Sequence, residues 1–186
     1  MDIFFTASFH GKDKYQKYYD MVLEALDNIG VTVISPEKGN YLEILTKKEL
    51  AKYKDPKLRH YEAIRKGIRW ADASVIEISQ EDFQLGHEAT LAIQNKKHVL
   101  CLSTKEDFAE KIKNRYFHAS RYNQFNIEEV VINFIKKIEG EALETRFNMF
   151  LSESQLSYLQ DVSERSGVNK SEYLRMLLDK DRIVES

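Results

Sequence analysis

Two carboxylates, Asp72 and Glu88, lie on either side of the apolar run Ala73–Ile78. The spacing predicts that Glu88 falls in the first turn of a helix, where the helix dipole and free backbone N–H groups favour an ionised carboxylate. An ionised carboxylate at the mouth of a crevice is a potential nucleophile. Taken alone, however, a glutamate that only complements the dipole is the commoner explanation, and Asp72 is equally well explained as a cap.

Two polar loops accompany these carboxylates. The loop Ser8-Phe9-His10-Gly11-Lys12 offers a hydroxyl, an imidazole, backbone N–H groups and an ammonium, which together could cradle an anion at a helix N-terminus. A plain strand-to-helix turn explains this loop as well. In the second loop, which leads to Glu88, Gly86 would let a substrate approach the backbone closely.

Short apolar runs alternate with helical periodicity along the first 140 residues, an order that predicts a parallel sheet covered by helices. The predicted strands are residues 3–7, 31–34, 73–78 and 99–102, with a fifth candidate at 117–122. The predicted helices are residues 15–29, 56–71, 86–94, 106–113 and 127–138. The polar, lysine-rich residues 36–55 are interpreted as a mobile helix or a flap over the sheet's end. Ligands of such sheets bind beyond the carboxyl ends of the strands, where both polar loops are expected.

The composition limits the class of protein. With 186 residues, 28 basic and 30 acidic side chains and one cysteine, the chain has room for one domain and a small appendage. One cysteine excludes a disulfide framework and a multi-thiolate metal site, and the five histidines form no His-x-x-x-His pair, so we expect neither metal nor cofactor. No apolar run approaches the ~20 residues of a membrane span, and no signal-peptide pattern is seen. We therefore expect a cytoplasmic protein without a membrane partner.

Four blocks together resemble the nucleoside 2-deoxyribosyltransferase superfamily, most closely its 2'-deoxynucleoside 5'-monophosphate N-glycosidase branch. They are residues 3–8, residues 70–79, the turn Leu85-Gly86-His87-Glu88 and residues 97–102, and their order and spacing match over about residues 1–125. The resemblance implies a flavodoxin-like, doubly wound sheet that is usually assembled as a homodimer or larger homo-oligomer. It also implies that Glu88 is the nucleophile on the anomeric carbon of a nucleoside or nucleotide. Asp72 would then be the second active-site carboxylate, which contacts the sugar or assists the leaving base.

The implied chemistry accounts for two carboxylates at one crevice. Cleavage of an N-glycosidic bond builds positive charge on the sugar, which an ionised glutamate can stabilise or capture as a glycosyl ester. The second carboxyl group would shuttle the proton. Water as acceptor makes the enzyme a hydrolase and a second base makes it a transferase, and the sequence leaves both open.

Three residues depart from the family's pattern. Phe4 stands where a tyrosine is common, and His10 stands where the monophosphate branch has arginine in a Ser-x-Arg-Gly loop. Asp82 replaces a phosphate-binding serine, and its carboxylate would repel a phosphate. Asp82 could instead accept a hydrogen bond from a sugar hydroxyl, as would suit an unphosphorylated nucleoside or a different head group. The residues expected to bind substrate are Ser8, Phe9, His10, Gly11, Asp82 and Gly86.

A composition break near Gly140 separates the predicted deoxyribosyltransferase-like domain, residues 1–140, from residues 141–186. This tail resembles a ribbon-helix-helix domain of bacterial repressors, with a strand at residues 146–151 followed by two helices. One strand and two amphipathic helices cannot close a core alone, so the tail must pair with another chain or pack onto the main domain. In the ribbon-helix-helix fold, paired strands face the DNA major groove, here with Arg146 and Asn148.

The charge of the tail argues against a strong grip on DNA. Residues 141–186 hold six basic and nine acidic side chains, whereas affinity for DNA is dominated by neutralisation of phosphates. We therefore favour dimerisation through the tail. The alternative function is a nucleotide-sensing, DNA-binding regulator without turnover, and the retention of both carboxylates favours the enzyme.

Overall fold

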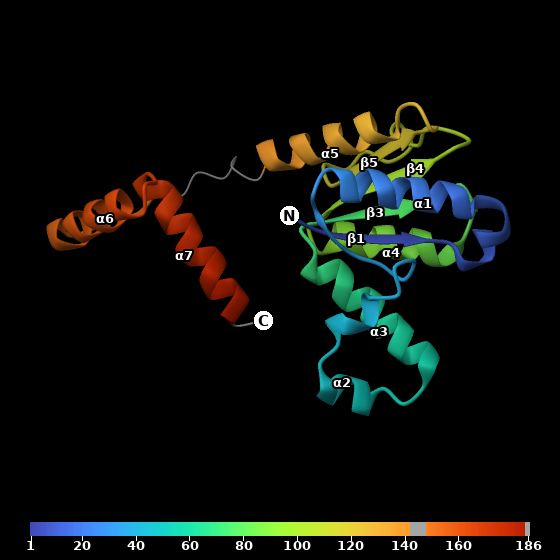
Figure 1. Ribbon diagram of the computed structural model, residues 1–186, viewed down its shortest axis with the longest axis horizontal. Helices are drawn as coiled ribbons and strands as arrows, with labels where there is room; N and C mark the ends of the chain where they lie inside the picture. Colours follow the sequence, from blue (N-terminus) through green and yellow to red (C-terminus); the bar gives the residue numbers. More distant parts are fainter. Residues whose placement is uncertain (142–147, 185–186) are drawn as a thin grey trace. The chain divides into compact units, whose positions relative to one another are not determined.

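The computed structural model describes residues 1–141 and 148–184, and the chain divides into two compact units, residues 1–143 and residues 144–186. The first unit is built on one parallel sheet (Figure 1). Its strands lie in the order β2-β1-β3-β4-β5. They are β1 (Asp2–Ala7), β2 (Thr32–Ile34), β3 (Ala73–Glu77), β4 (His98–Ser103) and β5 (Phe117–Arg121).

The strand order reverses between β1 and β3. From β1 the chain moves outward to β2, then crosses back to β3 on the other side of β1. The register of this central pair runs from Ile3 opposite Ala73 to Ala7 opposite Glu77, so the two strands finish side by side. In an open α/β sheet, this switch point is where a crevice forms beyond the strand ends.

Helices cover both faces of the sheet (Figure 1). Helices α1 (Lys12–Asn28) and α5 (Ile127–Glu141) pack on one face, and α3 (Pro56–Trp70) and α4 (Phe83–Gln94) on the other. Because the central strands are buried on both faces, they are continuous apolar runs without polar alternation. The α/β fold predicted from the sequence is thereby confirmed.

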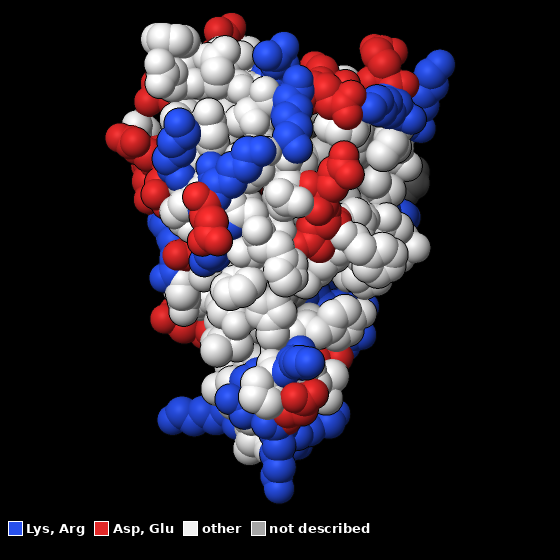
Figure 2. Space-filling model, turned by 90° about the vertical axis from the view of Figure 1, so that its right-hand side faces the viewer, with Lys and Arg blue, Asp and Glu red and all other residues white. Residues whose placement is uncertain are grey.

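The lysine-rich segment that the sequence left as a helix or a flap contains two short helices. They are the 3-10 helix η2 (Tyr41–Ile44) and the α-helix α2 (Lys47–Lys52). Thr46 and Glu49 form a reciprocal capping box at the N-terminus of α2. Figure 2 looks onto the end of the sheet where the strands finish, and basic side chains project at its lower end, where α2 lies. Elsewhere on this face acidic and basic side chains are interspersed.

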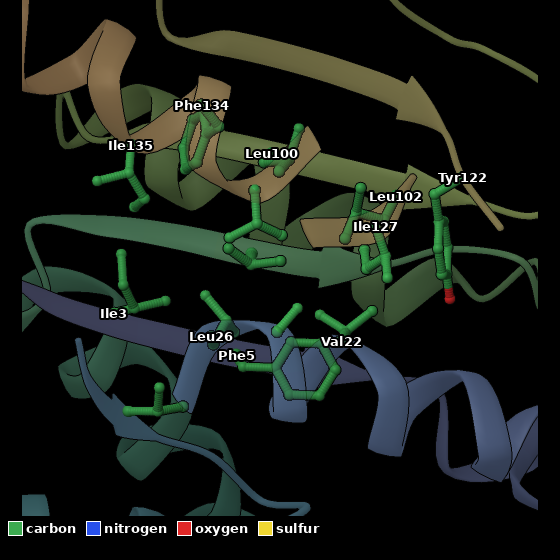
Figure 3. Close-up of a cluster of buried hydrophobic side chains, with 14 of the residues drawn as sticks. Ile3, Phe5, Val22, Leu26, Leu100, Leu102, Tyr122, Ile127, Phe134 and Ile135 are labelled. Carbon is green, nitrogen blue, oxygen red and sulfur yellow. The ribbon is translucent and has the colours of Figure 1, made fainter. Parts of the chain in front are cut away.

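The larger apolar cluster lies between the sheet and helices α1 and α5 (Figure 3). It brings strand residues such as Phe5 and Leu102 against Leu26 of α1 and Phe134 of α5. Tyr122 closes this cluster near the carboxyl ends of the strands, where its hydroxyl reaches a buried polar network. The core therefore holds the carboxyl ends of the strands in place.

Two of the helices predicted for the first unit differ in the structure. The helix predicted at residues 106–113 is absent, and the segment forms turns instead. Asp107 accepts a hydrogen bond from the backbone N–H of Ala109 at 2.8 Å, an Asx turn that competes with a helical start. Helix α4 begins at Phe83, before the predicted start at Gly86, because Asp82 caps its first turn. The fifth strand, by contrast, is confirmed.

The second unit contains α6 (Glu153–Arg165) and α7 (Lys170–Val184), as the sequence predicted. Asn169 caps α7 by accepting a hydrogen bond from the backbone N–H of Glu172 at 2.9 Å. The strand predicted at residues 146–151 is wrong over the described residues 148–151, which form neither strand nor helix, because an isolated strand has no partner for its backbone groups. Asn148 lies in this segment, whereas Arg146 falls outside the described residues.

In the described parts of the chain, none of the helices has the length and apolar character needed to cross a bilayer.

Candidate active site

A pocket of about 360 Å³ lies at the switch point, beyond the ends of β1 and β3. Its floor comes from the end of β1 and one wall from the start of α4. The other walls come from the 3-10 helix η1 (Phe9–Gly11), the loop after β2, η2 and α3. The lining residues are Thr6, Ala7, Phe9, His10, Lys12, Pro36, Glu37, Tyr41, His60, Asp82, Gln84 and Leu85. A volume of this size is at the lower end of the range for small-molecule sites.

Glu88 lies in the second turn of α4, behind the pocket wall, and only 1% of its surface is exposed. Gln84, one turn earlier, donates from Nε2 to its Oε1 at 2.8 Å. The other oxygen, Oε2, is buried and has no hydrogen-bond partner among the described residues. A buried carboxylate oxygen without a partner is costly, and native proteins keep such atoms mainly at functional sites.

The electrostatic state of Glu88 differs from the sequence expectation. We predicted an ionised carboxylate in the first turn of a helix, but the earlier start of α4 places Glu88 one turn further in, beyond most of the helix-end effect. Burial raises the pKa of Glu88 to about 7, and the negative charge of Asp82 acts in the same direction. The hydrogen bond from Gln84 and the nearby Thr6 hydroxyl oppose this increase. The pKa of Glu88 therefore lies near neutral pH, which suits a group that must change between its neutral and its charged form.

Asp82 occupies the position at which an anion would otherwise be held. Its Oδ1 accepts a hydrogen bond from the backbone N–H of Gln84 at 2.9 Å and thereby caps α4. Its Oδ2 accepts one from the hydroxyl of Ser8 at 2.6 Å. Ser8 and the N-terminus of α4, two groups that could bind a phosphate, are thus already satisfied by a carboxylate of the chain itself.

The basic side chain of the pocket is also neutralised. Lys12 forms a salt bridge with Glu37, with 3.0 Å between Nζ and Oε1, and the Glu37 side chain is only 4% exposed. Together with Asp82, these residues give this part of the pocket a net negative charge. A neutral or cationic ligand is therefore favoured over an anionic one.

Three further pocket residues form a hydrogen-bonded chain. The Tyr41 hydroxyl lies 3.0 Å from His60 Nδ1, and His60 Nε2 lies 3.5 Å from the Gln84 side-chain nitrogen that also contacts Glu88. Burial lowers the pKa of His60 and favours a neutral imidazole. We did not anticipate Tyr41 or His60 from the sequence. One signal was available: His60 continues the buried stripe of α3 toward its N-terminus, one turn before Ile64.

The expected site residues divide between those at the pocket and those elsewhere. Phe9 and His10 line the pocket, and Gly11 lies beside it, where an added Cβ would meet the Tyr19 hydroxyl at 2.3 Å. Gly86 lies on the exposed side of α4, with open space where a Cβ would be, and does not line the pocket. Phe4 is fully buried in the core against Gly67 of α3.

Asp72 lies at the opposite end of β3 from the pocket. Its Oδ2 accepts a hydrogen bond from the backbone N–H of Asp2 at 2.9 Å, and its own N–H donates to the Asp2 carbonyl at 2.8 Å. These bonds join the first residues of β1 and β3. The structure therefore does not bring Asp72 and Glu88 together, because a residue before a parallel strand and one after it lie at opposite edges of the sheet.

A second buried carboxylate, Glu77, supports the loop between β3 and α4. It is fully buried, accepts a hydrogen bond from the Tyr122 hydroxyl at 3.1 Å and contacts the Ser79 hydroxyl. The Ser79 hydroxyl accepts in turn from the backbone N–H of Thr104 at 2.8 Å and so connects the ends of β3 and β4. Burial raises the pKa of Glu77. This network fixes the backbone from which Asp82 and Gln84 are presented.

The buried carboxyls predict a pH dependence of stability. A group whose pKa is raised by folding contributes stability that is fully present below its ordinary pKa and is lost as the pH rises through its folded value. For Glu88 this window runs from 4.5 to about 7, which corresponds to a loss of about 3 kcal/mol. Urea unfolding should therefore give a free energy of unfolding that decreases between pH 5 and 8. Glu88→Gln should remove much of the decrease, and an identical pH dependence in both proteins would contradict the burial of Glu88.

The chain is similar in sequence and in structure to known proteins. No family model matches the chain. A curated protein of Nematostella vectensis, named as a 2'-deoxynucleoside 5'-phosphate N-hydrolase, is 27% identical over 148 residues, which cover 73% of this chain and 95% of that protein. The solved structure of a 2-deoxyribosyltransferase from Bacillus psychrosaccharolyticus matches with a TM-score of 0.51 and 19% identity, over 69% of this chain and 90% of that one. A CMP N-glycosidase of Clostridium botulinum matches with a TM-score of 0.46 and 13% identity, over 73% and 98% of the two chains.

The likeness to the 2-deoxyribosyltransferase shows the fold of the first unit: a five-stranded parallel sheet with helices on both faces. The fold alone does not determine which bond is cleaved, because one fold hosts many activities.

Proposed function

We propose that this protein cleaves the N-glycosidic bond of a nucleoside or nucleotide, by hydrolysis or by transfer, with Glu88 as the nucleophile. The observation that carries this proposal is the buried Glu88 carboxyl group, with one unpartnered oxygen, behind a pocket at the switch point of the sheet. The names of the Nematostella relative and of the deoxyribosyltransferase neighbour support the same reaction class.

The surroundings of Glu88 suit this reaction. Positive charge develops on the sugar as the bond to the base breaks, and a carboxylate in a site of low dielectric stabilises that charge strongly. Gln84 holds Oε1 by a hydrogen bond of 2.8 Å, and Oε2 is buried without a partner among the described residues. Attack by Oε2 on the anomeric carbon requires the Gln84 side chain, which lines the pocket, to move aside for the bound sugar. Because burial raises the pKa of Glu88 to about 7, a substantial fraction is ionised at neutral pH, and the anion lacks a hydration shell that would have to be removed.

We further propose that the substrate is an unphosphorylated nucleoside. A phosphate at the N-terminus of α4 would meet the carboxylate of Asp82, and the Ser8 hydroxyl already donates to that carboxylate. A sugar hydroxyl can instead donate to Asp82, in place of Ser8 or in addition to it. The relative is named for a phosphorylated substrate, so this preference separates the two chains.

Release of free base from a panel of ribo- and 2′-deoxynucleosides and their 5′-monophosphates, followed by chromatography, tests the proposal. We expect release from at least one nucleoside and slower release from its monophosphate. Parallel mixtures with a second base distinguish transfer from hydrolysis, because only transfer yields a new nucleoside. No release from any compound would contradict the proposed reaction class.

For the second unit we propose pairing with a second copy of the chain. Helices α6 and α7 bury Leu159 and Val162, but Leu178 stays 70% exposed and Tyr158 65% exposed. Two helices bury too little apolar surface to be stable alone, and a second copy would cover these side chains. The net negative charge of the tail favours this role over DNA binding.

Leu178→Glu should weaken this pairing, because it places a charge on an apolar surface that association would bury. We expect a lower molecular mass in solution by light scattering at micromolar concentrations. Lys180→Glu, which changes an exposed residue of the same helix, is the control and should leave the mass unchanged. A wild-type protein that is already monomeric would overturn the proposal.

A further inference from the structure

The pocket contains an imidazole, that of His60, to which the proposed attack by Glu88 gives no role. His60 lines the pocket from α3, and its ring is held by contacts with Tyr41 of η2 and Gln84 of α4. We propose that His60 exchanges the proton with the departing base, the role that the sequence resemblance assigned to Asp72. This inference rests on the proposed N-glycosidic cleavage, because it concerns the same site.

The geometry places His60 near the nucleophile. His60 Nε2 lies 3.5 Å from the side-chain nitrogen of Gln84, which lies 2.8 Å from Glu88 Oε1. Because the two contacts share one atom, Nε2 and Oε1 are separated by no more than 6.3 Å. Acid and nucleophile are ~5.5 Å apart in retaining glycosidases, where both must reach one glycosidic bond. A base attached to the carbon that Glu88 attacks can therefore lie beside His60.

The contacts of the ring leave Nε2 as the atom that faces the site. The Tyr41 hydroxyl lies 3.0 Å from Nδ1, and its ring packs edge-on against the imidazole with 5.3 Å between centroids. The Gln84 amide has two hydrogens, so it can donate one to Glu88 and point the other toward a neutral Nε2. A base that displaces the weak Gln84 contact gains direct access to Nε2.

The other ionisable groups of the pocket are less suited to this role. Both oxygens of Asp82 accept hydrogen bonds, from Ser8 and from the first turn of α4. His10 is exposed and packs edge-on against Phe9, on the η1 side of the pocket. Lys12 is paired with Glu37. Burial lowers the pKa of His60, so its protonated form is a stronger acid than an exposed imidazolium.

The proton balance of the reaction closes with these two residues. The reaction starts from the form in which Glu88 is ionised and His60 is protonated, a minor form because burial favours neutral His60. In the first step Glu88 bonds to the anomeric carbon, the carbon–nitrogen bond breaks with its electron pair going to the base, and His60 gives its proton to that nitrogen. In the second step neutral His60 takes a proton from water, whose oxygen attacks the anomeric carbon and releases the Glu88 carboxylate. With a second base as acceptor, His60 takes the proton from that base.

Substrates whose bases leave without a proton separate this role from a structural one. In 7-methyl-2′-deoxyguanosine and 5-fluoro-2′-deoxyuridine the base departs more easily unprotonated than in 2′-deoxyguanosine and 2′-deoxyuridine. We expect His60→Gln to lower kcat/KM by about 100-fold on the two parent nucleosides, within the range for a lost general acid. On the activated partner of each pair the loss should be several-fold smaller.

Two further variants keep the test decisive. His87→Gln is the matched control, because His87 stacks on Tyr61 and does not line the pocket. It should leave kcat/KM unchanged on both the parent and the activated nucleosides. Tyr41→Phe removes only the hydroxyl at Nδ1, so it still reports if His60→Gln fails to fold; we expect a loss of roughly 3- to 10-fold, again larger on the parent nucleosides. Equal losses on parent and activated substrates would overturn the role of His60. Wild-type protein that releases no base from these four or from any compound of the nucleoside and monophosphate panel would overturn the proposed function and this inference with it.

Discussion

Replacement of Glu88 by glutamine is expected to lower the rate of base release by at least ~1000-fold, because the amide cannot form the glycosyl ester or carry the negative charge that stabilises the transition state. The side chain has nearly the same volume, and Gln84 can still donate to its oxygen. The variant should therefore fold and bind nucleoside. Chromatography of released base at saturating nucleoside gives the rate, and circular dichroism verifies the fold.

The matched control for this prediction is Glu81→Gln. Glu81 lies in the loop before α4, seven residues from Glu88 in the sequence. Its side chain is exposed and does not line the pocket. The same chemical change there should leave the rate of base release within about twofold. If Glu88→Gln retained more than a tenth of the wild-type rate, Glu88 would not be the nucleophile.

Asp82→Ser should change the preference between a nucleoside and its 5′-monophosphate. The carboxylate that faces the Ser8 hydroxyl and the first turn of α4 disappears, and a serine can still cap the helix. Two juxtaposed negative charges cost several kcal/mol, so the kcat/KM ratio of monophosphate to nucleoside should increase by on the order of 100- to 1000-fold.

A second substitution at the same position shows whether charge is the cause. Asp82→Asn removes the negative charge but keeps a carbonyl oxygen that can accept from the Gln84 backbone. It should increase the ratio in the same direction as Asp82→Ser. If the ratio of kcat/KM values stays unchanged in both variants, Asp82 does not select against phosphate, and the substrate preference must come from another residue.

The fold could be predicted because its signals are local. Each central strand is a short apolar run buried on both faces, and the helix that ends before Asp72 shows one apolar stripe. The helix predicted at residues 106–113 failed because few apolar residues support it and Asp107 stabilises a turn. The early start of α4 was missed because Asp82 was interpreted as a ligand-binding residue and not as a cap.

The site was predicted only in part, for reasons of topology and burial. The loops after β1 and β3 were located correctly because the carboxyl ends of parallel strands meet at one edge. Asp72 was assigned to the same edge from the resemblance, although its place before a strand puts it at the other. The contact of Tyr41 with His60 joins two segments that sequence periodicity cannot bring together, and the pKa of Glu88 depends on side chains from β1 and α4 as well as on burial.

The most direct test of the central claim is to trap the sugar on Glu88. Fluorine on the carbon beside the anomeric carbon slows the breakdown of a glycosyl ester. Wild-type protein is therefore incubated with 2′-fluoroarabino nucleosides, quenched in acid, digested and analysed by mass spectrometry. The peptide that contains Glu88 should be heavier by one fluorinated sugar residue. The Glu88→Gln variant should show no such peptide. If the wild-type protein released base from these nucleosides while the Glu88 peptide kept its unmodified mass, the nucleophilic role of Glu88 would be contradicted.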